Sequence, residues 1–335
     1  MDANGPDFSL DRESNPTLIL GGSGFIGTRL ASLLQARGVP FCIGDLKRSA
    51  AFPAHWQECD VRRYESSMEL ARGAAAIMNL AAVHRDDVRP LSLYQEVNVD
   101  GARQVCMAAR KAGVGKIVFT SSVAVYGFQP APVDEDGPFA PFNEYGRTKL
   151  EAEAVYRSWA DEDAGRTLVI VRPTAVFGEG NRGNVYNLLH QIAARRFLMV
   201  GAGRNKKSIA YVENVAAFLT HILKLGPGTH IFNYVDGPDI DTQTLVEFVR
   251  RSLNLGVSEV RVPKAAAIAG GHIFDAMAHI TGRTFPISAI RVRKFCESTQ
   301  FLADRVLQTG FVPPYSLNEG LRRTIHFEFP ADHRP

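Results

Sequence analysis

Short, fully apolar runs alternate with longer stretches of helical pattern along the chain from Thr17 onward. Unbroken apolar runs of this length are typical of parallel strands that are covered on both faces. The expected strands are Thr17–Leu20, Pro40–Asp45, Ala76–Ala82, Lys116–Ser122, Thr167–Arg172 and His230–Val235. The expected helices are Phe25–Ala36, which Gly38 ends, Leu91–Ala112 and Tyr145–Ala160. This alternation predicts an α/β fold with a doubly wound parallel sheet and right-handed crossovers.

The pattern changes after Arg172, where the loops lengthen and Gly, Asn and Arg collect between Gly178 and Asn184. The tail from Gly256 has a helical pattern with prolines between its segments. We therefore expect a flexible N-terminal tail over residues 1–15 and a sheet domain over 16–180, to which 205–250 contribute. We expect residues 181–204 and 251–335 to form a smaller, mainly helical substrate-binding domain.

Composition narrows the class of protein. The 335 residues are 45% hydrophobic, as in a globular protein, and the net charge of +3 is too mild for a nucleic-acid-binding surface. The four cysteines form no CxxC pair and have no histidines at zinc-ligand spacing, so we expect no metal site and a reducing, cytoplasmic location. Ala265–Ile280 is the most apolar helical stretch. Because His272, Asp275 and His279 interrupt it, the pattern favours a packed or surface-lying helix over a membrane span.

A glycine-rich turn follows the first expected strand. Residues 21–27 read GGSGFIG, which places glycines at 21, 24 and 27 between a strand and a helix. In a dinucleotide-binding turn these glycines permit the tight bend, the close approach of a pyrophosphate and the packing of helix on strand. A glycine trio alone also suits an ordinary tight turn, and the spacing is GxxGxxG rather than GxGxxG. Its place at the first strand–helix junction predicts a Rossmann-type cofactor site made of Gly21, Gly24, Phe25, Ile26 and Gly27.

One acidic residue ends the second expected strand, and another follows the short strand that comes next. Asp45 stands 18 residues after Gly27, close to the ~20 residues expected for a ribose-binding acid. A carboxylate there accepts hydrogen bonds from the ribose hydroxyls and repels a 2′-phosphate, which favours NAD over NADP. The neighbouring cations Lys47 and Arg48 leave NADP open. Asp60, with Val61, is a second candidate for the cofactor site beside the adenine, and the alternative is a turn or capping aspartate.

Tyr145 and Lys149 form a YxxxK motif, and residues four apart share one face of a helix. A tyrosine with a pKa near ~10 is a poor base at neutral pH. A nearby ammonium group stabilises the phenolate, as does a positively charged nicotinamide ring. Tyr145 can then take a proton from a sugar hydroxyl while hydride leaves for NAD. A surface tyrosine–lysine pair would show the same spacing.

A second motif, FTSSVAVYG over residues 119–127, ends the expected strand Lys116–Ser122 at the carboxyl edge of the sheet. Ser122 in this motif can hydrogen-bond the same hydroxyl and steady its proton. A serine at a strand end also commonly serves as a turn or helix cap. The combination of both motifs favours a catalytic set of Ser122, Tyr145 and Lys149.

With these motifs the chain resembles an extended short-chain dehydrogenase/reductase of the NAD-dependent epimerase/dehydratase family. The resemblance runs from Thr17 to at least Phe327 and also rests on NLAA at 79–82, VNV at 97–99, RP at 172–173 and VFG at 176–178. It implies an NAD or NADP cofactor, a nucleoside-diphosphate-sugar substrate, and Ser122, Tyr145 and Lys149 as the catalytic residues. It also implies that Ala81 and Ala82 line the cofactor site and that Asn98 supports the central helix.

The resemblance also narrows the reaction. Dehydratases of the family carry Asp-Glu directly after the catalytic serine or threonine, whereas this chain has Val123 and Ala124. Two reactions therefore stay open: 4-epimerisation of a UDP-hexose or UDP-N-acetylhexosamine, and NAD(P)H-dependent reduction of a UDP-4-keto-6-deoxy-N-acetylhexosamine. A non-catalytic dinucleotide sensor is a lower alternative, because such proteins often lose the tyrosine or lysine. The two expected helices Leu91–Ala112 and Tyr145–Ala160 are those through which family members often form homodimers.

The substrate contacts are also carried by resemblance. Many 4-epimerases carry an asparagine shortly after the arginine that matches Arg172, where this chain has Ala175. The expected contacts to the substrate are His84, Ser122, Asn184, Val185, Lys207 and Arg291, with Arg293 close by. A solvated basic side chain is the alternative for Lys207 and Arg291, and a structural loop histidine is the alternative for His84. The stretch from Gly183 to Phe218 looks most like proteins that make modified UDP-N-acetylhexosamines for bacterial surface polysaccharide.

Overall fold

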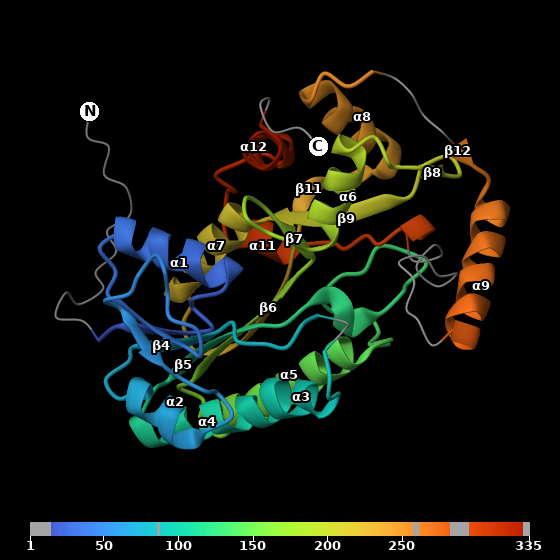
Figure 1. The fold of residues 1–335 in the computed structure, drawn as a ribbon. Helices are drawn as coiled ribbons and strands as arrows, with labels where there is room; N and C mark the ends of the chain where they lie inside the picture. The colour runs from blue at the N-terminus through green and yellow to red at the C-terminus, as the bar shows by residue number, and fades with distance from the viewer. Residues whose placement is uncertain (1–14, 86–87, 257–260, 282–294, 331–335) are drawn as a thin grey trace, which may run out of the picture. The chain divides into compact units, whose positions relative to one another are not determined.

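The computed structural model describes residues 15–85, 88–256, 261–281 and 295–330 (Figure 1). The chain divides into two compact units. The first comprises residues 1–127, 139–172 and 215–232, and the second comprises 128–138, 173–214 and 233–335. The expected ranges 16–180 and 205–250 overlap the first unit without coinciding with it, because strands that follow Arg172 form a separate sheet.

A seven-stranded sheet forms the centre of the first unit, in the order β10-β6-β5-β4-β1-β2-β3. Its strands are β1 (Thr17–Leu20), β2 (Phe41–Asp45), β3 (Trp56–Glu58), β4 (Ala76–Asn79), β5 (Lys116–Thr120), β6 (Thr167–Pro173) and β10 (Gly228–Tyr234). All pairings from β3 across to β6 are parallel. The strand order reverses between β1 and β4, and sheets of this kind bind ligands at the carboxyl ends of the strands there. The predicted doubly wound fold is confirmed.

Two expected strands, Ala76–Ala82 and Lys116–Ser122, are shorter than the apolar pattern indicated. β4 ends at Asn79 because the Asn79 side chain accepts a hydrogen bond from the Ala81 N–H at 3.0 Å, which turns the chain out of the sheet. β5 ends at Thr120, after which Ser122 begins a short helical turn. Both endings place polar side chains, Asn79 and Ser122, at the carboxyl edge of the sheet.

Helices cover both faces of this sheet. They are α1 (Phe25–Ala36), α2 (Tyr64–Ala71), α3 (Ser92–Tyr94), α4 (Gly101–Ala112), α5 (Glu144–Asp161) and α7 (Val212–His221). Figure 1 shows α2, α4 and α5 together on one face, with α1 on the other. Gly38 has a φ of +66° directly after α1, which confirms it as the residue that ends this helix. A hydrophobic core between α2, α4, α5 and the sheet includes Leu18, Val105, Phe119 and Trp159, all at most 1% exposed.

The expected continuous helix Leu91–Ala112 contains a π-helical segment, Gln95–Asp100, between α3 and α4. A π-turn widens the helix by one residue and therefore changes the direction of its side chains. Asn98, in the middle of this segment, is buried and points at two other segments of the unit. The apolar spacing contains no signal for this irregularity.

The second unit has a three-stranded sheet, in the order β11-β9-β7, and a two-stranded sheet, β12-β8. Its strands are β7 (Ala175–Phe177), β8 (Met199–Val200), β9 (Lys206–Tyr211), β11 (Asp236–Asp241) and β12 (Arg261–Val262). Its helices are α6 (Asn184–Ala193), α8 (Thr242–Ser252), α9 (Lys264–Thr281), α11 (Asp304–Gln308) and α12 (Leu317–Glu328). Gly320 lets α12 pack on β9, since a Cβ there would lie 2.6 Å from the Tyr211 ring. No helix in the described part of the chain is both long enough and apolar enough to cross a membrane.

Candidate active site

The glycine turn joins β1 to α1 as the sequence predicts. Gly21 has a φ of +77°, and a Cβ on it would lie 2.6 Å from the Ala81 nitrogen. A Cβ on Gly27 would lie 2.6 Å from the Gly22 Cα, so both positions require glycine. Gly24 is exposed and begins α1 without a side-chain cap, which leaves the first N–H groups of the helix for another acceptor. An uncapped helix start in such a turn fits a phosphate group.

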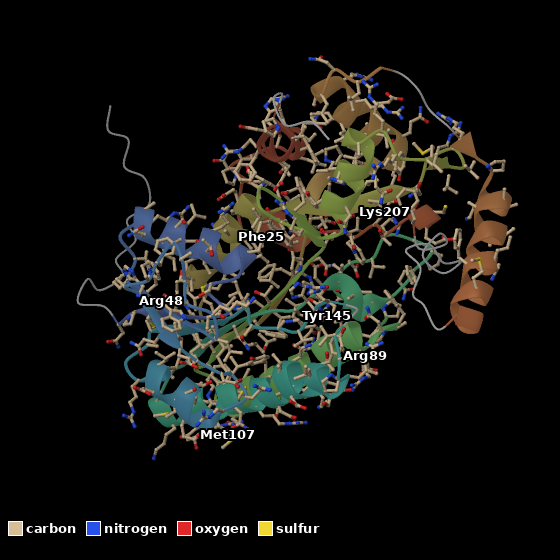
Figure 2. The ribbon with its side chains drawn as sticks, viewed as in Figure 1. Phe25, Arg48, Arg89, Met107, Tyr145 and Lys207 are labelled. Atoms are coloured by element: carbon tan, nitrogen blue, oxygen red, sulfur yellow. The ribbon has the colours of Figure 1, made fainter. Side chains whose placement is uncertain are left out.

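Asp45 lies beside this turn at the end of β2. Its carboxylate accepts a hydrogen bond from the Ser23 N–H at 3.0 Å and another from the Lys47 N–H at 2.9 Å. The hydroxyl of Ser23 is buried without a hydrogen-bond partner among the described residues. A buried hydroxyl and an oriented carboxylate next to an uncapped helix start fit the polar groups of a dinucleotide. Lys47 and Arg48 are exposed, and Arg48 is labelled in Figure 2.

The second acidic candidate is already paired. Asp60 accepts a hydrogen bond from the Arg62 main chain at 3.0 Å, and its carboxylate lies 2.7 Å from the Arg62 guanidinium. The hydrogen bond from the Arg62 side chain holds the pKa of Asp60 below its usual value. Val61 is 6% exposed and packs against Gly101. The turn-forming alternative therefore has direct geometric support, and a cofactor contact by Asp60 or Val61 stays a prediction.

The segment after β4 is held against the glycine turn. Ala81 and Ala82 are half-buried there, and the close approach of Ala81 to Gly21 is the reason that Gly21 cannot carry a side chain. Asn98 accepts a hydrogen bond from the Val83 N–H at 2.9 Å and donates to the Val83 carbonyl at 3.0 Å. It also donates to Thr148 Oγ1 of α5 at 2.9 Å. Asn98 thus links the segment that is predicted to line the cofactor to α5, which carries the predicted catalytic residues Tyr145 and Lys149.

The first unit brings Ser122, Tyr145 and Lys149 together. Ser122 caps the turn Val123–Tyr126 by accepting a hydrogen bond from the Ala124 N–H at 3.1 Å, so its capping role coexists with its predicted catalytic one. Gly146 lets α5 begin directly on this turn, since a Cβ there would lie 2.5 Å from the Ala124 carbonyl oxygen. Tyr145, marked in Figure 2 near the start of α5, consequently hydrogen-bonds to Ser122.

Burial disfavours both the Tyr145 phenolate and the Lys149 ammonium group in the protein alone. It raises the pKa of Tyr145 to about 12, against the lowering effect of the hydrogen bond with Ser122. It lowers the pKa of Lys149 to about 7, which the charge of Glu153 partly offsets. The Lys149 Nζ donates to the Thr120 carbonyl at 2.7 Å and lies 6.0 Å from the centre of the Tyr145 ring. A positive nicotinamide ring at this edge of the sheet would favour the phenolate that the chemistry requires.

A buried ion pair close to Lys149 was not identified from the sequence motifs. Glu153 and Arg172 are both 0% exposed, and the Arg172 side chain donates to the Glu153 carboxylate at 2.8 and 2.6 Å. The carboxylate also accepts a hydrogen bond from Ser121 Oγ at 2.6 Å, next to Ser122. A usable signal was present, because Glu153 stands one turn beyond Lys149 on the same face of α5.

His84 follows the cofactor wall and has an exposed side chain. The surrounding protein atoms lower the pKa of His84 by reducing its hydration, and the charges of Lys149 and Arg85 lower it further. His84 therefore lies close enough to Lys149 to sense its charge. This position fits the predicted substrate contact, which stays a prediction.

The remaining predicted substrate residues belong to the second unit. Asn184 is the exposed first residue of α6, and Val185 beside it is half-buried. Lys207 on β9 is half-buried and donates to the Glu297 carbonyl, and burial lowers its pKa to about 8. Arg291 and Arg293 lie outside the described residues. Within the described ranges, no cluster of His, Cys, Asp and Glu could hold a metal ion.

Replacing Lys149 by methionine is expected to make the free energy of unfolding less dependent on pH. The pKa of folded Lys149, about 7, lies below the ordinary lysine value of 10.5, so protonation opposes folding. That cost grows as the pH falls from 10 to 7 and is constant below. The variant should therefore gain stability relative to the wild type across this range, by a few kcal/mol, since one pKa unit corresponds to about 1.4 kcal/mol.

Urea unfolding at a series of pH values measures this difference. Lys111→Met, at an exposed lysine of α4, is the matched control and should show no such trend. A stability difference for Lys149→Met that stays flat between pH 7 and 10 would contradict the assigned burial of the charge.

The glycine turn, Asp45 and the serine–tyrosine–lysine set together define a Rossmann-type dinucleotide-dependent enzyme. A profile of the NAD dependent epimerase/dehydratase family matches residues 17–234, and the chain belongs to this family. The family expected from the motifs, and with it an NAD-dependent enzyme, is confirmed.

Individual proteins are similar over nearly the whole chain. An N-acetyl-α-D-glucosaminyl-diphospho-ditrans,octacis-undecaprenol 4-epimerase of Escherichia coli O157:H7 is 46% identical, over 93% of this chain and 95% of the relative. A UDP-glucose 4-epimerase of Vibrio cholerae is 26% identical, over 97% of this chain and 99% of the relative. Among solved structures, MoeE5 in complex with UDP-glucuronic acid and NAD has a TM-score of 0.75 at 21% identity, over 93% of this chain and 98% of that chain, which shows the shared fold.

Proposed function

We propose that the chain is a 4-epimerase of N-acetylglucosamine carried on a diphosphate. The observation that carries the proposal is a complete Ser122–Tyr145–Lys149 set followed by a turn, Val123–Tyr126, that offers no acid or base for elimination. The only titratable side chain of that turn is Tyr126, and its hydroxyl accepts a hydrogen bond from Arg172 at 2.5 Å. Proton transfer at a hydroxyl is therefore supplied at this site, whereas dehydration is not.

The chemistry follows from the placement of these groups. Tyr145 as phenolate takes the proton of the C4 hydroxyl, and Ser122 steadies that oxygen through a hydrogen bond. NAD, when bound, would supply the acceptor and donor of the C4 hydride. Tyr145 returns the proton to the C4 oxygen after hydride return to the opposite face of the sugar. Lys149 stabilises the phenolate, and Asn184, Val185, Lys207 and Arg291 are the proposed contacts to the rest of the substrate.

Two carriers of the sugar are compatible with this chemistry. The relative with 46% identity is named for an undecaprenyl diphosphate carrier, which favours a polyprenyl-diphosphate-linked substrate. The UDP-sugar expected from the sequence is the second candidate, supported by the UDP-glucose 4-epimerase that is 26% identical. Both carriers present a diphosphate next to the sugar, so the same cations can serve either one. A cytoplasmic location is proposed with them, supported by four free thiols.

The first experiment purifies the protein without added cofactor and identifies the nucleotide that denaturation releases. The protein is then incubated with N-acetylglucosaminyl-diphospho-polyprenol in detergent and, separately, with UDP-N-acetylglucosamine, and the 4-epimer is measured by NMR. Retained NAD and epimer without net redox change are expected, with faster turnover on the polyprenyl substrate. Faster turnover of the UDP-sugar would reverse the choice of carrier. An empty protein that reduces a 4-keto-6-deoxy sugar with NAD(P)H, and forms no epimer, would replace the proposal by the reductase.

We also propose a homodimer that forms through α4 and α5. A groove of about 740 Å³ lies along these helices, with Met107 46% exposed and Val155 half-buried in its lining. Figure 2 marks Met107 on α4. Apolar side chains that lie in water on a helix pair are typical of subunit contacts. Sedimentation velocity is expected to show a dimer of the wild type and a dissociation constant at least tenfold higher for Met107→Asp. A monomeric wild type, or a variant that dimerises as the wild type does, would contradict this interface.

A further inference from the structure

Helix α9 of the second unit has an apolar surface where a surface helix normally has polar side chains. Ala265, Ala269, Ile273 and Met277 follow one another at intervals of four residues and are all exposed. Ile273 is 63% exposed and Met277 is 42% exposed. We refer to these four residues as the α9 stripe. Since residues four apart lie on one side of a helix, the α9 stripe is a continuous apolar surface.

The other side of the same helix is its packed side. Gly271 is buried, and Ile268 and Phe274, three residues before and after it, are half-buried. The helix therefore carries apolar side chains both on its packed side and in the α9 stripe, which lies beside the exposed His272. Exposed apolar surface of this kind marks a contact with a partner or a membrane.

The charges around α9 favour an anionic partner. Arg261 and Lys264, just before the α9 stripe, are exposed, and the Lys264 ammonium lies 3.6 Å from the Glu297 carboxylate. Basic side chains beside an apolar helix face are the combination that binds the surface of an anionic bilayer.

We propose that the α9 stripe docks on an anionic phospholipid bilayer, with Ile273 and Met277 inserted among the acyl chains and Lys264 and Arg261 at the phosphate groups. This inference rests on the proposed function for its purpose, because a polyprenyl-diphosphate-linked sugar is held at a bilayer surface by its lipid. The helix lies along the surface, since its packed side stays on the protein. Docking brings an enzyme to a substrate that cannot diffuse freely into water.

Co-sedimentation of the full chain with vesicles tests the proposal. Vesicles of phosphatidylethanolamine and phosphatidylglycerol are compared with vesicles of phosphatidylcholine alone. The wild type is expected to bind the anionic vesicles, more weakly as the salt concentration rises. Ile273→Asp combined with Met277→Asp is expected to lower the partition coefficient at least tenfold, which corresponds to about 1.4 kcal/mol.

A matched control carries the same two charges elsewhere on exposed apolar residues of the second unit. Leu307→Asp combined with Val312→Asp changes side chains that are 66% and 80% exposed, and it should bind vesicles as the wild type does. Retained NAD and an unchanged thermal midpoint in both double variants exclude unfolding as the cause of any loss.

Three outcomes would overturn the docking proposal. The wild type does not bind anionic vesicles at low salt, or the α9 stripe variant binds them as the wild type does. In the third, the α9 stripe variant is monomeric without lipid while the wild type and the control variant are dimers. The last outcome would assign the α9 stripe to a second copy of the chain. Vesicle binding is measured without turnover, and turnover is measured in detergent. Failure of the epimerase proposal therefore leaves the docking result readable, and the reverse also holds.

Discussion

Replacing Tyr145 by phenylalanine is expected to lower kcat for epimerisation by about 10²–10⁴-fold, the usual contribution of a positioned acid–base group. The substitution removes only the hydroxyl that hydrogen-bonds to Ser122 and that exchanges the proton with the C4 hydroxyl. The aromatic ring of residue 145 is kept in the variant. Binding of substrate should change little, so the loss should appear in kcat rather than in KM.

Epimer formation by NMR, together with the NAD content of the purified variant, checks this expectation. NAD should be retained, because the glycine turn and Asp45 are untouched. A Tyr145→Phe variant that epimerises at the rate of the wild type would remove the catalytic role of the serine–tyrosine–lysine set and, with it, the central observation behind the proposed function.

The second large effect concerns stability. Arg172→Met leaves the Glu153 carboxylate buried without its main cation, and loss of one partner of a buried pair typically costs about 3–5 kcal/mol. Arg157→Met removes the other cation of Glu153, which lies 3.0 Å away with its side chain 32% exposed. Because Arg157 is partly exposed, its pair with the buried Glu153 is expected to contribute less than the fully buried Arg172–Glu153 pair. The two variants therefore separate burial from charge pairing at the same carboxylate.

Urea unfolding of both variants and of the double variant Arg172→Met with Glu153→Leu measures these differences. The double variant should recover much of the stability lost in Arg172→Met, since no unpaired charge then stays buried. Equal losses for Arg172→Met and Arg157→Met would show that the buried pair does not carry the expected cost. So would a double variant that is no better than the single one.

The doubly wound parallel sheet could be predicted because each central strand is a short apolar run that is typical of a sheet covered on both faces. The site at the carboxyl edge followed from the same regularity, since GGSGFIG, FTSSVAVYG and YGRTK all stand at strand or helix ends. The π-helical turn around Asn98 could not be predicted, because the polar contacts to Val83 and Thr148 that it serves link segments distant in sequence.

The Glu153–Arg172 pair was missed for a related reason. A buried arginine is unexpected in an apolar strand, and Glu153 lies outside the YGRTK motif. The substrate side was least accessible to sequence reasoning. Lys207 was expected to contact the substrate diphosphate, with a solvated side chain as the alternative, and its ammonium group contacts the Glu297 carbonyl, a partner 90 residues away in the sequence. Long-range partners of this kind leave no trace in local spacing.

The interleaved course of the chain also has a consequence for its synthesis. The first unit is complete once residue 232 has been made, but the segment 128–138 belongs to the second unit. Val133 in that segment pairs with Phe301, and Asn233 bonds to Leu302, 69 residues later. At about 5–20 residues per second a ribosome needs roughly 3–14 seconds to translate that stretch. During this interval a finished nucleotide-binding sheet waits on the ribosome with an unpaired loop, whose strand partner has not yet been translated.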